Sequence, residues 1–189
     1  LTLPRWVSIA EGLQFAESKK RWIERRFLDI PARTPFADGA IVPILGESCH
    51  IRHRPDALPI VWRKNREIHV GGAGDKLPEN LVIWLRKEAF VEIGNRARAK
   101  TALLDLPVPP VSVRDTRSLW GSCSPTGRLS FCWRLIMAPE PILDYVVAHE
   151  VAHLRYHHHG KRFWDLVAKL TGDVEAARAW LRQEGARLH

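Results

Sequence analysis

The chain has little of what holds small secreted domains together or anchors a protein in a membrane. Only three cysteines occur among 189 residues, at wide spacing, so we expect no disulfide framework. No stretch approaches the ~18 consecutive apolar residues that a membrane-spanning helix needs, and the first residues lack the layout of a signal peptide. These absences predict a cytoplasmic protein in a reducing compartment.

Acidic residues are also scarce relative to basic ones. The chain has 21 Asp and Glu against 29 Lys and Arg, which gives a net charge of +8. This excess favours an anionic partner such as a nucleotide or a nucleic acid. The alternative is an Arg-rich surface with evenly spread charge, because the basic residues form no dense tract. The rest of the composition is that of a folded globular chain with about one domain.

The first part of the sequence, residues 1–75, is expected to form one helix followed by a layer of short strands. Ser8 and Glu11 have the spacing of a capping box, which predicts a helix over residues 8–28. Shorter apolar runs then follow, separated by turn residues. We interpret them as an antiparallel meander with strands at residues 41–45, 50–54, 60–62 and 67–70.

The second part, residues 76–189, alternates between helical and strand patterns. A long helix is predicted over residues 78–104, and further helices after Pro139, at 161–170 and at 174–185. Three strands lie between the first two helices, and the last two of them form a hairpin through residues 124–127. The strands are predicted at residues 111–113, 118–123 and 128–133. The expected fold class is α+β, and the two parts are expected to form one compact domain.

The pentapeptide at residues 149–153 has the pattern His-Glu-x-x-His. Four residues advance a helix by about 400° and 6 Å, so His149 and His153 lie on one face, one turn apart. Both imidazoles can then reach one zinc ion. Glu150 lies beside that ion, where a carboxylate can take a proton from water whose pKa the metal lowers.

The context of this motif favours a metal over an exposed face of His and Glu side chains. The preceding turns of the helix are apolar, so the motif is held against a core. Burying three polar side chains without a common partner would cost several kcal/mol. A metal ion supplies that partner.

A catalytic zinc site usually has three protein ligands, so a third one is needed. If the helix continued, His157 and His159 would lie about 12 Å and 15 Å along its axis from His149, which is too far to share an ion. The helix must therefore end soon after Leu154, with Gly160 as a natural reversal point. His159 is the favoured third ligand, and the alternatives are Glu175, His157 and His158.

Four separated motifs resemble the YgjP-like metallopeptidase family, a relative of the SprT-like zinc proteins. They are Trp-Gly-Ser-Cys-Ser at residues 120–124, Trp-Arg-Leu at 133–135, the segment 146–154, and His-Gly-Lys-Arg-Phe-Trp at 159–164. The resemblance implies a zincin-like catalytic core with short antiparallel strands. It also implies zinc bound by His149, His153 and His159, with Glu150 as catalytic acid and base. The family often has Asn-His-Ser where this chain has His-His-Gly, at residues 158–160.

The residues around the predicted metal site have more than one candidate role. In a zincin, an edge strand above the metal can pair with an extended peptide, and residues 129–133 are the best candidate here. The alternative is that this hairpin only covers the core. Tyr156 or His157 is expected to stabilise the oxyanion. Arg155 and Arg162 are candidates for holding an anionic substrate, although solvated surface charge is the favoured interpretation.

The expected function is zinc-dependent hydrolysis of peptide bonds, with Glu150 as general base. One alternative keeps the metal and changes the substrate to a nucleotide, as in a UTP-type pyrophosphatase. Another is a nucleic-acid-associated protease or binding module, which the basic charge favours. One zinc ion is the expected cofactor, and other divalent transition metals fit the same histidines.

Overall fold

The structure is a computed structural model that describes residues 3–28, 35–58 and 60–189. It has two compact units, Leu1–Arg33 and Thr34–His189. The strands predicted for the first part of the sequence share one core with the region that follows residue 76. Within the described residues, no helix has both the length and the apolarity that crossing a bilayer requires.

The N-terminal unit contains helices α1 (Ile9–Ser18) and α2 (Lys20–Leu28). The capping box is confirmed: the Glu11 N–H donates to Ser8 Oγ at 3.2 Å, and the Ser8 N–H donates to Glu11 Oε2 at 2.9 Å. The single helix expected over residues 8–28 is interrupted at Lys19. The Lys19 N–H is shared between the carbonyls of Phe15 and Ala16, which closes the first helix one residue before the second begins.

A four-stranded sheet opens the second unit, in the order β1-β2-β4-β3. Strand β4 lies between β2 and β3, and it runs parallel to β2 with His50 opposite Glu67. The expected antiparallel meander is therefore wrong at this pair. The reason is that β3 folds back on the outer side of β4, through a tight turn with Asn65 at φ 56°. The strands are β1 (Ile41–Ile44), β2 (Glu47–Arg54), β3 (Val61–Lys64) and β4 (Glu67–Gly71).

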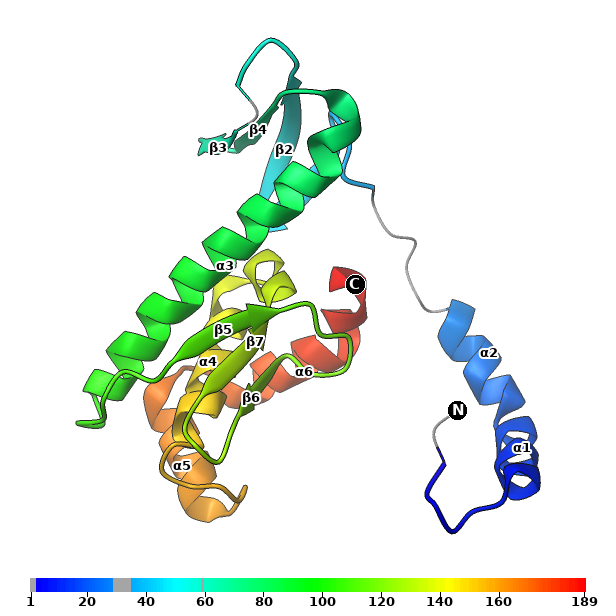
Figure 1. The fold of residues 1–189 in the computed structure, drawn as a ribbon. Helices are drawn as coiled ribbons and strands as arrows, with labels where there is room; N and C mark the ends of the chain where they lie inside the picture. The colour runs from blue at the N-terminus through cyan, green and yellow to red at the C-terminus, as the bar shows by residue number, and fades with distance from the viewer. Residues whose placement is uncertain (1–2, 29–34, 59) are drawn as a thin grey trace. The chain divides into compact units, whose positions relative to one another are not determined.

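Helix α3 (Leu77–Ala102) follows the short 3-10 turn η1 (Gly74–Lys76) and connects the two halves of the unit. Figure 1 shows it running from the four-stranded sheet to the second sheet. It buries one apolar residue every four positions, and these residues form a stripe that turns by about 40° around the helix at each step. These residues are Leu77, Leu81, Leu85, Ala89, Ile93 and Ala97.

The second sheet has three strands in the order β5-β7-β6. The hairpin between β6 and β7 is confirmed, and Gly127 takes φ 76° in its turn. Strand β7 also pairs in parallel with β5, Val111 opposite Leu129. Residues 129–133 are therefore wrong as an edge strand, since β7 is central, and the edge beside α4 belongs to β6. The strands are β5 (Val111–Arg114), β6 (Gly121–Cys123) and β7 (Leu129–Cys132).

Helices complete the unit on one side of this small sheet (Figure 1). Most of α4 is buried, including Leu143, Val147 and Val151. Helices α5 and α6 both pack against the common core, through Phe163, Val167 and Ala177. The elements are η2 (Trp133–Met137), α4 (Glu140–Ala152), α5 (Lys161–Leu170), α6 (Val174–Glu184) and η3 (Gly185–Leu188).

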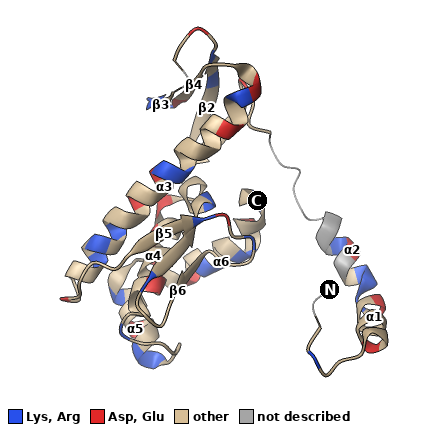
Figure 2. Cartoon of the chain, viewed as in Figure 1, with Lys and Arg blue, Asp and Glu red and all other residues tan. Residues whose placement is uncertain are grey.

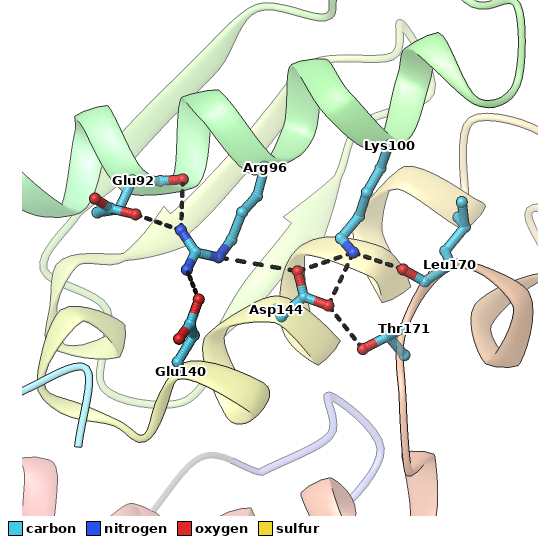
Figure 3. A network of polar contacts seen from close by, with 7 residues as sticks. All are labelled: Glu92, Arg96, Lys100, Glu140, Asp144, Leu170 and Thr171. Carbon is cyan, nitrogen blue, oxygen red and sulfur yellow. Dashed lines mark hydrogen bonds and ion pairs between the residues drawn. The ribbon is translucent and has the colours of Figure 1, made fainter.

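A buried lysine at the end of the α3 stripe ties α4 in place (Figure 3). Lys100 Nζ lies 2.9 Å from Asp144 Oδ1 of α4, and it donates to the Leu170 carbonyl at the end of α5 at 2.6 Å. Thr171 Oγ1 donates to the same carboxylate at 2.9 Å. A buried ammonium needs such partners, because an unpaired charge is costly in the interior.

Asp144→Ala should destabilise the fold by about 2–3 kcal/mol, because it leaves Lys100 buried with one carbonyl as partner. Urea unfolding of the metal-free protein measures this effect. Glu140→Ala is the matched control, since Glu140 also pairs with α3, through Arg96, but is 65% exposed. The control should cost less than about 1 kcal/mol. Equal losses for the two variants would contradict the role of the buried network.

Candidate metal centre

Three histidine side chains converge at the C-terminal end of α4. Their donor nitrogens all lie within 4.8 Å of one another, and Nε2 of His149 is 3.1 Å from Nε2 of His159. Two nitrogens bound at 2.0–2.1 Å to one tetrahedral ion would lie about 3.3 Å apart. Among the residues that the structure describes, this is the one group of His, Cys, Asp or Glu donors found close enough to share an ion.

The local fold explains how the third histidine reaches the first two. Helix α4 ends at Ala152, and the N–H groups of Arg155 and Tyr156 both donate hydrogen bonds to the Ala152 carbonyl. The predicted helix end is therefore present, about two residues early. Gly160, the expected reversal point, is the N-cap of α5 with φ −78° and ψ −180°, an extended conformation that any residue can adopt. His159 precedes it and faces His149.

Two aromatic residues of α5 form a wall around the histidine rings. Phe163 is fully buried, and its ring centroid lies 4.6 Å from those of His153 and His159. The ring centroid of Trp164 lies 5.6 Å from that of His159. His153 is further oriented by a 3.1 Å contact between its Nδ1 and the Tyr156 carbonyl, which leaves Nε2 for the cluster. Sequence reasoning gave neither aromatic residue a role, although they come four and five residues after the third histidine.

Burial favours the neutral, metal-binding form of the His149 and His153 imidazoles. It lowers the pKa of His149 to about 4, and the neighbouring His153 and His159 act in the same direction. Burial also lowers the pKa of His153. Because a metal ligand must offer a free lone pair, neutral imidazoles at physiological pH fit a divalent transition metal at this cluster.

Glu150 lies one residue along α4 from the first histidine and faces strand β6. Its side chain is 6% exposed, and burial raises its pKa to about 7. A carboxyl group with a pKa near neutrality can both accept and release a proton.

Glu150→Gln should stabilise the metal-free protein by about 3 kcal/mol at pH 8. The folded pKa, about 7, exceeds the unfolded value of 4.5, so ionisation destabilises the wild type as the pH rises between these values. At pH 5 the two proteins should differ by less than about 1 kcal/mol. Urea unfolding of both proteins at both pH values measures the difference in stability. The titration of His149 cancels in this difference, because both proteins contain His149. A difference that does not widen with pH would contradict a buried carboxylate.

The other predicted site residues are not part of the histidine cluster. Arg155, Tyr156 and Arg162 line an open groove of about 490 Å³. The Arg155 guanidinium donates to the Leu104 carbonyl at 2.5 Å, which ties it to the end of α3. His157 is exposed in the turn, as is His158.

Glu175, the rival third ligand, lies on α6, where it is paired with Arg178. Its side chain is 73% exposed and is not part of the donor cluster. Figure 2 shows Lys and Arg positions, coloured blue on the ribbon, along α2, α3, α5 and α6. This arrangement agrees with the evenly spread charge that the sequence left open.

Comparison with known proteins assigns the sequence to a family. Residues 1–184 match the family model described as YgjP-like, metallopeptidase domain. Among solved structures, the crystal structure of the metallopeptidase zymogen of Pyrococcus abyssi abylysin is 19% identical, with a TM-score of 0.38. The match covers 55% of this chain and 95% of that one. No curated protein matches the chain. Because the family model spans nearly the whole sequence, the chain belongs to the YgjP-like family and has its metallopeptidase domain.

Proposed function

We propose that the chain is a zinc-dependent peptidase in which His149, His153 and His159 hold the metal and Glu150 is the general base. The observation that carries the proposal is a donor cluster of three imidazoles next to a buried carboxyl group of raised pKa. Three protein ligands leave a fourth position free for water or substrate. When bound, zinc supplies a Lewis acid and lowers the pKa of water.

The chain's own proton chemistry centres on Glu150. Its carboxylate accepts the proton of the attacking water and then delivers that proton to the leaving amine nitrogen. Burial favours the protonated form of the Glu150 carboxyl group. A metal ion held by the three histidines would favour the ionised form. The two effects together prepare the carboxylate to take a proton at neutral pH and to release it within the same reaction. Tyr156 and His157 stay the candidate donors to the oxyanion.

The free edge of β6 is the proposed binding place for the substrate backbone. The Cys132 N–H donates to the Trp120 carbonyl and the Ser124 N–H donates to the Arg128 carbonyl, so Trp120 and Ser124 face β7. Backbone groups alternate in an antiparallel pair, so those of Gly121 and Cys123 point away from β7. An extended peptide can add to this edge as a further strand.

A nucleotide substrate is the second candidate. The observation that favours it is the groove beside Tyr156, which Arg155, Arg162 and Lys169 line with positive charge. Phosphate groups are well matched to such guanidinium side chains. Asp105 and Asp165 lie in the same groove and partly offset that charge.

One assay separates the two substrates. Zinc-loaded protein is incubated with an unfolded protein and, separately, with UTP, and products are followed by mass spectrometry and an assay of pyrophosphate release. We expect new peptide termini that disappear with a chelator and return with zinc. Release of pyrophosphate from UTP without any peptide cleavage would contradict the peptidase and establish the alternative.

A further inference from the structure

Gly121 of β6 lies directly against the side chain of Glu150. A Cβ atom at position 121 would be 2.7 Å from Glu150 Cγ, 2.7 Å from Oε1 and 2.9 Å from Cδ. Side-chain carbons essentially never approach other heavy atoms within 3.0 Å. The Glu150 side chain therefore occupies the volume that any other residue at position 121 would need.

The backbone of β6 gives no separate reason for glycine at this position. Gly121 is not among the residues with positive φ, and it pairs with Phe131 in a regular antiparallel ladder. An alanine would thus fit the strand conformation. The close approach of Glu150 is what the glycine accommodates.

The overlap cannot be relieved by rotating the carboxylate alone. One of the two closest atoms is Cγ, whose position is set by the first side-chain torsion. Glu150 is also 6% exposed, so neighbouring atoms leave little room for another rotamer. A methyl group at position 121 must therefore move the whole carboxyl group or separate β6 from α4.

We propose that Gly121 is a positioning residue, whose missing side chain sets the place of the Glu150 carboxylate beside the histidine cluster. The catalytic part of this inference rests on the proposed peptidase function. Gly121→Ala should lower kcat by about 10²-fold, the effect of misplacing a reacting group by about 1 Å. The KM should change little, because alanine keeps the backbone N–H and carbonyl of position 121 that the β6 edge would offer to a substrate. Metal content should also change little, because the histidine donors lie outside this contact.

A double-mutant cycle, read out by thermal unfolding, tests the contact between position 121 and Glu150 without using activity. Gly121→Ala should lower the Tm of the metal-free protein by about 3–10 °C, the range for one overpacked methyl group. Glu150→Gln keeps Cγ, so the same loss should appear in that background. Glu150→Ala removes Cγ, so the loss should shrink to less than about a third there. Glu150→Gly, which has no atom at the γ position, repeats the test if the alanine variant does not fold.

Gly94→Ala is the matched control, because no atom lies within 4 Å of a Cβ placed at that helical position. It should leave the Tm and kcat unchanged or raise the Tm slightly. If Gly121→Ala alone does not fold, recovery of folded protein in the Gly121→Ala, Glu150→Ala double variant gives the same support.

Two results would overturn the inference. One is an equal Tm loss from Gly121→Ala in the Glu150→Gln and Glu150→Ala backgrounds, which would mean that β6 needs the glycine for a reason other than Glu150. The other is a Gly121→Ala enzyme with wild-type kcat. Failure of the peptidase proposal is distinct from both: the wild type would then lack peptide cleavage, while the Tm cycle would still show the contact.

Discussion

Glu150→Gln lowers the kcat for peptide cleavage by about 10²–10⁴-fold, the range that general base catalysis contributes. Glutamine has nearly the same shape but cannot accept the proton of the attacking water. Because Glu150 is not one of the three clustered donors, the variant should bind metal like the wild type. Steady-state kinetics on a fluorogenic peptide measures the loss, with metal content determined on the same samples.

Glu140→Gln controls for this change, because Glu140 is another glutamate of α4 whose side chain is 65% exposed. It should retain wild-type kcat. The role of Glu150 as general base would be contradicted if Glu150→Gln kept more than half of the wild-type kcat at equal metal loading.

His149→Ala and His153→Ala should each weaken zinc binding by more than about 100-fold. Changes one shell further out already cost 10–100-fold in affinity, so the loss of a direct ligand should cost more. Competition with a chromophoric chelator measures the affinity. The expected reason for the loss is the cluster itself, in which the donor atoms of the three histidines lie within 4.8 Å of one another.

His158→Ala is the matched control, since His158 is exposed and is next to His159 in sequence but outside the cluster. Its zinc affinity should equal that of the wild type. If His149→Ala instead bound zinc as tightly as His158→Ala, the metal would have to be held by other residues.

Local patterns predicted the helices and the spacing of the candidate ligands. Four-residue spacing places His149 and His153 on one face of a helix in any globular fold. The need for a third ligand then predicts an end to that helix, and α4 ends at Ala152. The capping box at Ser8 was readable for the same reason, because its partners are three residues apart.

Strand order could not be read in this way, because it depends on partners that are distant in sequence. Nothing local to β4 shows that it lies between β2 and β3, or that β5 takes the far side of β7. The meander and the edge strand at residues 129–133 were wrong for this reason. The interruption of the first helix at Lys19 has a different cause, since no proline or glycine marks it.

The contacts that hold the site also span long distances in sequence. Gly121 meets Glu150 through the packing of β6 on α4, and Lys100 meets Asp144 through the packing of α3 on α4. Glycine in a strand predicts a bulge or a close approach, but not which residue approaches. A lysine in an apolar stripe likewise predicts a buried partner without naming it.

X-ray absorption at the zinc edge of the metal-loaded wild type tests the central claim most directly. The account predicts four light-atom ligands at about 2.0–2.1 Å, with the scattering pattern of three imidazoles and one oxygen. A sulfur ligand at about 2.3 Å would contradict it, because the nearby Cys123 would then replace a histidine or close the open position. So would a spectrum with fewer than three imidazoles.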